Sequence, residues 1–476
     1  MIRPSLVVII TLVASAGQAT AAPDVADPPP PADQGPETTP DLTPPPAPQP
    51  APPPPPAASA AVAGTEHLTT ETYDRDQPID LHWHILNVPG YLLEIVVMPI
   101  TLAVEYTERH YIHRRVADLL SFYDGKIKIS PRFKLAFGDG LGVGAAIKFP
   151  KLLSRSAKLS FGGMYRLNRD WKLDADYLQR IGFIERRALH IDGFAEHDGN
   201  ARYYGIGGDT PEADRRAMLD DEQALVVGLD VFARDTYDWS GIVELGVFRQ
   251  HLGPGIEPML KPGEVPHEPL GSPGDHVELP PGFNDTSVLG HLGLGLRYDT
   301  RDTKGRPTKG SIVDGKLKAR SDVAGALSGV KFEFSTQLFL SVLPDARLFV
   351  VTVGGSAAVP IFTDSEIPLN TLSILGREHR LRGYDRGRFR DYYAGWVNVE
   401  YRYPIYEYLT TGAGLDAFLF TDVASAFGED KLTAKRVRYS TGVGFRGAHE
   451  TRLVFESFVG WSPEGFQFVI GAEQKL

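Results

Sequence analysis

The chain has 476 residues, a formal net charge of −11 at pH 7 and no cysteine. Without cysteine, disulfide bonds and thiolate chemistry are excluded, so the fold must be stabilised by burial and backbone pairing alone. The acidic balance, with no sustained basic stripe, argues against a nucleic-acid partner.

Residues 1–22 are predicted to form a secretory signal peptide. Arg3 precedes an apolar core from Leu6 to Val13, and small residues follow as far as Ala22. This core is shorter than a membrane-spanning helix. The protein is therefore expected to leave the cytoplasm.

A proline-rich linker is predicted over residues 23–65. Seventeen prolines lie between Pro23 and Ala57, with almost no large apolar side chain. Such a segment cannot bury a core and is expected to be disordered and extended, at about 3 Å per residue. It is interpreted either as a tether without recognition or as a docking site for a periplasmic or cell-wall partner.

Residues 66–124 are predicted to be a helical segment at the periplasmic mouth or on the inner leaflet of the membrane. Apolar residues crowd together from Tyr91 to Val104, but Pro89, Glu94 and Pro99 interrupt them. The run is shorter than the roughly twenty residues that a spanning helix needs. Two kinked amphipathic helices are therefore expected, rather than a membrane span.

From Lys126 onward the hydrophobic period changes to two, as in KIKISPRFKLAF, where apolar residues alternate with charged and polar ones. About sixteen such segments start near residues 126, 141, 157, 170, 185, 221, 239, 286, 310, 329, 346, 392, 413, 436, 450 and 465. They predict an all-β fold, a transmembrane antiparallel β-barrel over residues 125–476 with a polar lumen. A soluble sandwich would rarely place so many charges on its inward positions.

The lengths of the connections predict the orientation of the barrel. If the first strand rises from the periplasm, the odd-numbered connections are extracellular and long. The three longest, residues 197–220, 253–285 and 361–391, follow the fifth, seventh and eleventh strands. Pro131 lies inside the first strand, which is tolerable at the seam with the last strand or at a local bulge.

The third long connection contains LRGYDRGRFRD, residues 381–391, with four arginines and two aspartates. Its Leu381-Arg382-Gly383-Tyr384 run resembles the (V/L/I)-R-G-(F/Y) signature in the sixth extracellular loop of the bacterial surface antigen superfamily of outer-membrane barrels. That superfamily includes the barrel-assembly insertase and the two-partner secretion transporters. Three further runs are similar to family segments: YDTRDTKGRPTKG (298–310), RYYGIGGDTP (202–211) and FTDVA (420–424), the last with alanine in place of the family's glycine.

Alternation predicts which side chains of the neighbouring strands face this loop. Asp416, Phe418, Phe420 and Asp422 share one face of their strand, so Asp422 is expected to point into the lumen. Glu400 is expected to do the same from the preceding strand. Phe420, Asp422 and Glu400 are therefore the expected lumen partners of the loop.

The resemblance implies that the loop folds back inside the barrel, where Arg382 can reach Asp422 or Glu400 in a charge-assisted pair. Gly383 would let the backbone turn sharply or pack closely, and Tyr384 would pack on lumen aromatics. A solvated arginine-rich surface loop is the alternative. Contact with lipid phosphate is a further alternative for three arginines of the loop, Arg386, Arg388 and Arg390.

Signals for chemistry are weak. There is no G-x-S-x-G elbow, and the paired carboxylates Asp174 and Asp176 are ordinary lumen charges. Four histidines lack carboxylates or cysteines at a fitting spacing for a metal site: His82, His84, His110 and His113. No enzyme activity, cofactor or metal is predicted. Residues 58–125 read as helical and leave little room for a POTRA module, which many family members carry.

The expected location is the outer membrane of a Gram-negative bacterium, with the N-terminal segment in the periplasm. Outer-membrane lipids and a protein or lipid cargo are the expected partners. The resemblance implies insertion or translocation of proteins or lipids through a lumen plugged by the loop. The alternatives are a passive diffusion channel, or a structural anchor that links the outer membrane to the cell wall through residues 23–65.

Overall fold

The computed structural model describes residues 119–472, apart from short gaps at 124, 137–138, 153–155, 182–186, 232–237, 257–266, 342–346, 378–379, 409–412, 429–432 and 450–451. The chain divides into two units, residues 1–79 and 80–476, and every described residue belongs to the second. The predicted signal peptide, the proline-rich linker and nearly all of the predicted helical segment lie outside the described residues. In the part of the chain that is described, no helix has the length and apolar character needed to cross a membrane.

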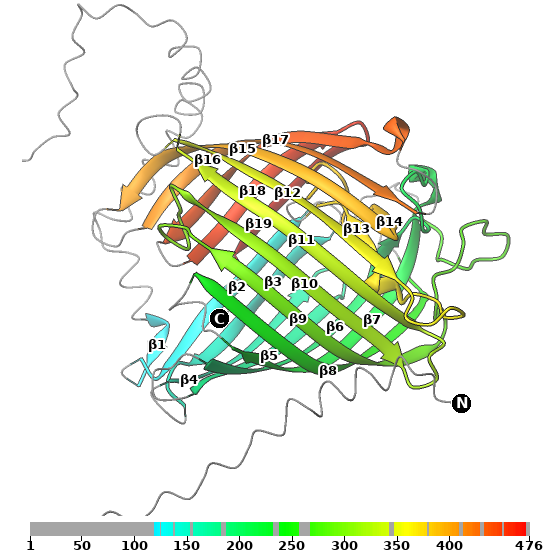
Figure 1. Ribbon diagram of the computed structural model, residues 1–476, viewed down its shortest axis with the longest axis horizontal. Coiled ribbons are helices and arrows are strands. Elements are labelled where there is room, and N and C mark those ends of the chain that lie inside the picture. Colours follow the sequence, from blue (N-terminus) through cyan, green and yellow to red (C-terminus); the bar gives the residue numbers. More distant parts are fainter. Residues whose placement is uncertain are drawn as a thin grey trace, which may run out of the picture. The chain divides into compact units, whose positions relative to one another are not determined.

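Sixteen antiparallel strands form one closed barrel (Figure 1). In chain order they are β2 (Ile127–Ala136), β3 (Gly140–Phe149), β4 (Ala157–Arg166), β5 (Trp171–Ile181), β6 (Arg187–Tyr203), β7 (Arg216–Asp230), β8 (Trp239–Pro254), β9 (Thr286–Asp299), β10 (Gly310–Asp322), β11 (Ser328–Leu340), β12 (Leu348–Val359), β15 (Tyr393–Tyr408), β16 (Ala413–Phe427), β17 (Arg438–His449), β18 (Arg452–Ser462) and β19 (Gly465–Ala472).

Three short strands lie outside this set. β1 (Ser121–Phe122) pairs with the start of β2, while β13 (Ser373–Leu375) and β14 (Phe389–Asp391) pair with each other in the connection between β12 and β15. Single 3₁₀ turns occur at η1 (Glu212–Asp214), η2 (Leu369–Thr371) and η3 (Ala434–Arg436). We refer to residues 360–392 as loop 360–392.

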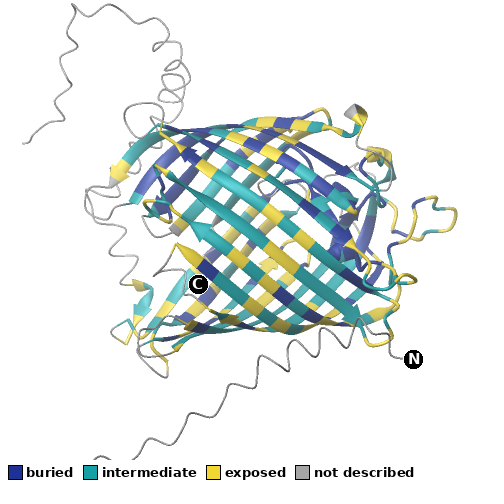
Figure 2. Ribbon diagram, viewed as in Figure 1, coloured by how far each residue is buried: buried dark blue, intermediate teal, exposed yellow. Residues whose placement is uncertain are grey.

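The predicted fold class, a transmembrane barrel of about sixteen strands, is confirmed. The alternation that predicted it appears as exposed and buried positions along each strand (Figure 2). On β2, Phe133 and Leu135 face outward with 41% and 37% of their surface exposed, whereas Arg132 faces inward with 5% exposed. An apolar outer surface and a charged interior are what a membrane-spanning barrel requires.

The predicted connection at 197–220 is wrong in extent. β6 continues to Tyr203 and β7 already begins at Arg216, so only residues 204–215 lie between them. The strands are prolonged past the alternating segment because a register shift between Asp198 and Ala201 accommodates the irregular pattern. Their charged ends pair with other extracellular loops, as described below. The other two long connections span 255–285 and 360–392, close to the prediction.

The seam between the first and last barrel strands is described as far as Ala472. Within the described residues, β2 and β19 share four register pairs, from Phe133 with Ala472 to Ala136 with Val469, whereas β2 and β3 share nine. The Ile129 amide donates to the Leu120 carbonyl across this edge (2.8 Å), so Pro131, two residues on, faces the same edge. The missing donor therefore falls at the seam. The β2–β3 register runs through Pro131 without a shift, so the bulge alternative is wrong.

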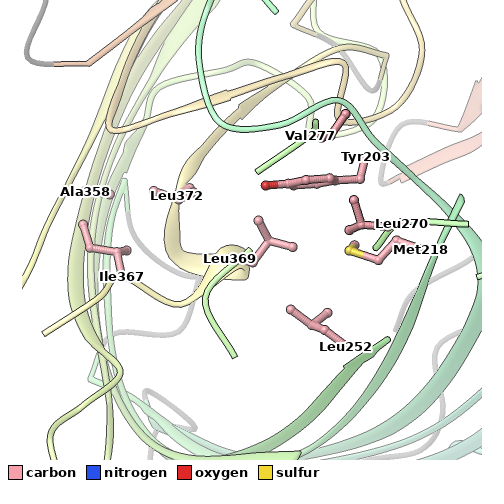
Figure 3. Packing of buried hydrophobic residues seen from close by; sticks show 9 residues of the cluster. All are labelled: Tyr203, Met218, Leu252, Leu270, Val277, Ala358, Ile367, Leu369 and Leu372. Atoms are coloured by element: carbon pink, nitrogen blue, oxygen red, sulfur yellow. The ribbon is translucent and has the colours of Figure 1, made fainter. Parts of the chain in front are cut away.

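An apolar cluster joins the extracellular connections to one another inside the barrel mouth (Figure 3). Tyr203 and Met218 come from the ends of β6 and β7, Leu270 from connection 255–285, and Leu369 and Leu372 from loop 360–392. Each of the five is at most 1% exposed. Loop 360–392 is therefore packed against neighbouring loops before it reaches the strands that carry the candidate site.

Candidate functional site

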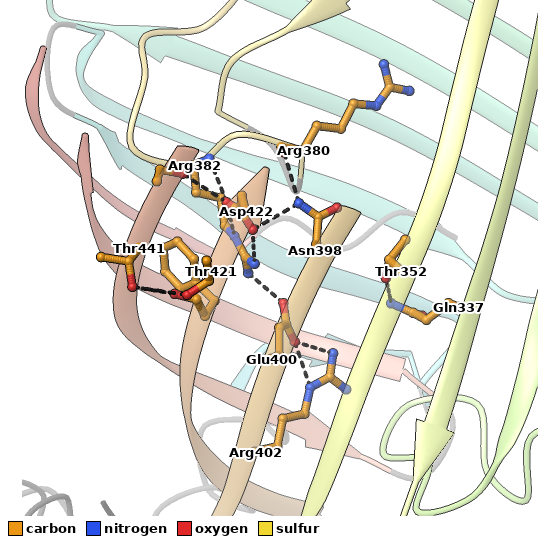
Figure 4. A network of polar contacts seen from close by, with 12 residues as sticks. Gln337, Thr352, Arg380, Arg382, Asn398, Glu400, Arg402, Thr421, Asp422 and Thr441 are labelled. Atoms are coloured by element: carbon orange, nitrogen blue, oxygen red, sulfur yellow. Dashed lines mark hydrogen bonds and ion pairs between the residues drawn. The ribbon is translucent and has the colours of Figure 1, made fainter. Parts of the chain in front are cut away.

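The tip of loop 360–392 lies against the inner faces of β15, β16 and β17 (Figure 4). Leu381 is fully buried, Arg382 is 1% exposed and Tyr384 is 2% exposed. The alternative of a solvated surface loop is therefore inconsistent with the structure. The buried charge of Arg382 must be compensated where it lies.

Arg382 is bound by two carboxylates from adjacent strands. Its Nη2 and Nε donate to the two oxygens of Asp422 at 2.6 and 3.0 Å, and its backbone N–H donates to Oδ2 at 2.9 Å. Its Nη1 donates to Oε1 of Glu400 at 2.5 Å. Burial alone would lower the pKa of Arg382, but the Glu400 and Asp422 carboxylates raise it above its ordinary value. The guanidinium is thus a permanent cation held in one orientation.

Asp422 has no exposed surface, and its remaining hydrogen bonds come from two residues that the sequence analysis missed. Asn398 Nδ2 donates to Oδ1 at 2.9 Å, and Ser440 Oγ donates to Oδ2 at 3.2 Å. Asn398 could have been found by alternation, because it shares the inward face of β15 with Glu400. Ser440 could not, because only the register of β16 with β17 sets it opposite Asp422.

Phe420 contributes a flat apolar surface beneath the charge. The Arg382 Cζ atom lies 3.7 Å from the centroid of the Phe420 ring, a cation–π geometry. On the other side, Arg402 donates to Oε2 of Glu400 at 2.7 and 2.9 Å, which leaves neither Glu400 oxygen unpaired. The charges therefore alternate along the inner wall from Asp422 through Arg382 and Glu400 to Arg402.

Gly383 is required by close packing. A Cβ at this position would lie 2.6 Å from the Trp461 carbonyl oxygen and 2.7 Å from Ser440 Cβ. Gly460 opposes it: a Cβ there would lie 2.9 Å from the Arg382 backbone. Of the two roles expected for Gly383, the structure has the close approach of two backbones.

Tyr384 packs chiefly on its own loop. Its ring contacts Phe389 edge-on, with centroids 5.3 Å apart, and Trp396 of β15 belongs to the same apolar cluster. Burial raises the pKa of Tyr384 to about 12. Tyr384 is expected from the sequence to pack on aromatic residues of the lumen. It packs beside one aromatic residue of the wall, Trp396, and one of its own loop, Phe389.

Arg388 does not reach lipid. It is 2% exposed and donates to both carboxylate oxygens of Glu464 at 2.7 and 2.8 Å and to the Thr210 carbonyl at 2.8 Å. Thr210 belongs to the YGIG-containing run. In the same run, the Gly207 amide donates to the Arg390 carbonyl at 2.7 Å. Two motifs far apart in sequence therefore meet at the extracellular mouth.

A second set of ion pairs ties loop 360–392 to the first hairpin and the last strand. Arg377, 1% exposed, donates to Asp139 in the β2–β3 turn at 2.5 Å and to Gln467 of β19 at 3.5 Å. Arg202 of β6 donates to Asp385 at 2.6 Å. Burial alone would raise the pKa of Asp139, but Arg377 and Arg202 hold it below its ordinary value. We call Arg377, Asp139, Gln467, Arg202 and Asp385 the extracellular latch.

The YDTRDTKGRPTKG run, residues 298–310, contacts the same inner wall at its periplasmic end. In the β9–β10 turn, Arg306 donates to Asp416 at 2.7 and 2.9 Å and to Glu407 at 2.6 Å. Asp416 shares the inward face of β16 with Phe420 and Asp422. The inner wall of β15 and β16 is therefore held from both ends, by loop 360–392 above and by this turn below.

Sixteen strands with an apolar outer surface, a charged interior and a long internal loop define a transmembrane barrel of the outer-membrane type. Residues 279–455 match the Omp85 superfamily domain, and this range contains loop 360–392, the β9–β10 turn and most of the inner wall that they contact. Residues 279–455 thus carry an Omp85 superfamily domain, which confirms the family indicated by the sequence motifs. An Omp85 barrel indicates the outer membrane of a Gram-negative bacterium.

Three solved structures align with this chain. The crystal structure of BamA from Haemophilus ducreyi lacking POTRA domains 1-3 aligns with a TM-score of 0.50 and 15% sequence identity, covering 73% of this chain and 70% of that chain. CdiB from Acinetobacter baumannii has a TM-score of 0.43 and 13% identity over 73% of this chain and 60% of that chain. CdiB from Escherichia coli has a TM-score of 0.46 and 11% identity over 72% and 62%. No curated protein matches the sequence.

Proposed function

We propose that the protein inserts or translocates proteins or lipids at the outer membrane, through a lumen that loop 360–392 keeps closed at rest. Barrels of the Omp85 superfamily are insertases and transporters rather than enzymes, and no catalytic step is proposed here. The residues proposed to carry the function are Leu381, Arg382, Gly383 and Tyr384 of the loop, with Phe420, Asp422 and Glu400 of the wall.

The observation that supports this proposal is the pairing of Arg382 with Asp422 and Glu400. A loop whose only role was to narrow a pore would not need a buried guanidinium bound by two carboxylates on separate strands. A buried ion pair adds little net stability, but removing one partner typically costs about 3–5 kcal/mol because the other charge is left uncompensated. Such a contact fixes one loop position strongly and disfavours intermediate ones.

The test is single-channel conductance of the refolded mature protein in planar bilayers, compared with a variant that lacks residues 374–391. Small, flickering currents that become large and steady in the deletion variant are expected. Arg382→Ala and Asp422→Ala should each move the conductance in the same direction. Arg216→Lys is the matched control, because Arg216 also binds an aspartate, Asp275 at 3.0 Å, but lies outside loop 360–392.

Large, steady currents in the unmodified protein would instead mean a passive diffusion channel. If both alanine variants leave the currents and the cellular phenotype unchanged, the proposed role of the ion pair is wrong.

For the N-terminal part of the chain, we propose a signal peptide at 1–22, a periplasmic tether at 23–65 and a helical segment at 66–124. Deleting residues 23–65 should abolish function if the protein is an anchor to the cell wall, and should spare it if the barrel acts alone.

A further inference from the structure

A cavity of about 290 Å³ lies between the inner faces of β10 and β11 and loop 360–392. Five cationic side chains and one carboxylate line it: Lys316, Lys318, Arg320, Lys331, Arg380 and Glu333. None of these six residues belongs to the ion pair of Arg382. The cavity is therefore a separate feature of the lumen.

The register of β10 with β11 brings positive charges together, which is unfavourable when no anion is bound. Lys318 of β10 is the direct register partner of Lys331 of β11, so two lysines lie opposite each other on the same inward face. Like charges directly opposite each other destabilise a sheet. Lys316 lies opposite Glu333 of β11, but on the other side of β10 the register partner of Lys318 is Gly293, which offers no side chain to balance it.

The neighbouring carboxylates are already engaged. Glu333 accepts from Arg380 at 2.6 Å. Glu222 lies 3.9 Å from Arg320 and accepts from Asn370 at 3.0 Å. Glu244 of β8, whose charge acts on Lys318, lies 3.5 Å from His291. A surplus of positive charge is left at the cavity.

Several donors at the cavity have no hydrogen-bond partner within the described residues. Lys316 and Lys318 make no hydrogen bond or ion pair there, whereas Lys331 donates to the Leu372 carbonyl at 3.0 Å. Arg320 Nη1 and Thr371 Oγ1 are buried without a hydrogen-bond partner, and Thr371 as a whole is 3% exposed. Unsatisfied buried donors around a polar cavity are costly, and an acceptor that fills the cavity removes the cost.

We propose that this cavity binds a phosphate group, either inorganic phosphate or a phosphate monoester. A dianion between Lys318 and Lys331 turns their repulsion into two charge-assisted contacts. Its oxygens point in several directions and so suit donors from a strand pair and a loop better than a flat carboxylate does. The site does not depend on the proposed function, because Lys318 and Lys331 belong to the wall.

A neighbouring cavity has room for the organic substituent of a phosphate ester. A second cavity, of about 380 Å³, shares Lys331, Asn370 and Arg380 with the first and extends toward β6 and β7. Its lining mixes aspartates with arginines, including Asp198, Asp220 and Arg202. This composition is compatible with a hydroxyl-rich group more than with an acyl chain. The phosphate is therefore recognised in the first cavity and its substituent in the second.

The test is equilibrium binding of radiolabelled inorganic phosphate to the mature protein, refolded in phosphate-free detergent. Saturable binding is expected, and the double variant Lys318→Gln with Lys331→Gln should weaken it by about tenfold or more, as the loss of one or two charge-assisted contacts implies. Lys172→Gln is the control: it removes a lumen cation on β5 that is paired with Glu196 at 3.2 Å, and should change binding less than twofold.

Competition separates the two sources of phosphate. Displacement by glycerol 3-phosphate but not by phosphatidic acid vesicles assigns a free solute, and displacement by the vesicles assigns a lipid headgroup; both support the site. Absence of saturable binding, or equal loss in Lys172→Gln, overturns it. In phosphate-free buffer, Lys318→Gln should melt at the same temperature as the unmodified protein or higher, since a repulsion is removed. A clear loss of stability would show a structural lysine and also overturn the proposal.

Discussion

At the scale of single residues, the candidate site depends on two features of residues 381–384, a charge and the absence of a side chain. Arg382 is held by carboxylates on two strands, so the loop cannot shift along the wall without breaking both pairs. Gly383 lets the loop backbone approach Ser440 and Trp461 closely enough for those pairs to form. The two residues are therefore coupled, one through its charge and the other through its lack of a side chain.

Gly383→Ala should disturb the site without changing any charge. The new methyl would lie 2.6 Å from a backbone oxygen, so the loop tip must move away and lengthen the contacts of Arg382. A loss of about 1–3 kcal/mol in unfolding free energy is expected, together with faster tryptic cleavage of loop 360–392 in the folded barrel.

Gly315→Ala is the matched control for that substitution. Gly315 lies in β10, and a Cβ there would meet nothing within 4 Å. Equal effects of the two alanines would mean that the close approach at Gly383 is not what positions the loop.

At the scale of elements, the extracellular latch and the seam belong together. Arg377 contacts the turn that follows β2 and also β19, the two strands that share four register pairs within the described residues. In the same described part of the chain, backbone pairing holds the other barrel strand pairs over greater lengths. The latch therefore ties the position of loop 360–392 to the integrity of the barrel wall.

Acid should release the latch through Asp139. Its pKa is depressed in the folded state, so its contribution to stability is present above the ordinary aspartate pKa, about 3.9, and is lost as the pH falls below it. Single-channel conductance should stay low from pH 7 to about pH 4 and rise below that. Asp139→Asn should show the raised conductance already at pH 7.

The control for the acid experiment is Asp209→Asn. Asp209 is also near an arginine, Arg436 at 3.6 Å, but its side chain is 61% exposed. An acid response that is identical in the unmodified protein and in Asp139→Asn would place the titrating group elsewhere.

Alternation predicted the strands well because lipid on one side and charge on the other constrain every second residue. The exceptions follow the same physics. The ends of β6 and β7 carry charged residues at consecutive positions, such as Asp220, Asp221 and Glu222, so their pattern reads as a connection. Alternation places Asn398 on the inward face with Glu400, but it carries no charge to single it out, and Ser440 depends on register, which a sequence pattern does not specify.

At the scale of the whole molecule, two connections enter the barrel from opposite ends and contact the same part of its inner wall, β15 and β16. Loop 360–392 enters from above and the β9–β10 turn from below, both against β15 and β16, while the cationic cavity lies by β10 and β11. Under the proposed function, an open path through the lumen requires the loop to leave β15 and β16. Opening of the seam offers a second route, through the wall.

A disulfide across the seam distinguishes these routes. The chain has no cysteine of its own, so Ala136→Cys with Val469→Cys, which are register partners, introduces one defined bond. If cargo leaves through the wall, this variant should fail to complement a deletion strain under oxidising conditions and should recover when reduced. Ser130→Cys with Ala146→Cys, across β2 and β3, is the control and should complement in both conditions. Full complementation by the oxidised seam variant would contradict an exit through the wall.

Pro131 and β1 also have a consequence for how the chain matures. The seam joins residues 133–136 to residues 469–472, so it is the pairing with the longest intervening chain and the last to be satisfied during assembly. Until then the first barrel strand is an edge, and free edges recruit strands from other chains. β1 occupies its lower part and proline removes a donor just above. The nascent protein therefore carries its own protection against aggregation at the edge that waits longest for a partner.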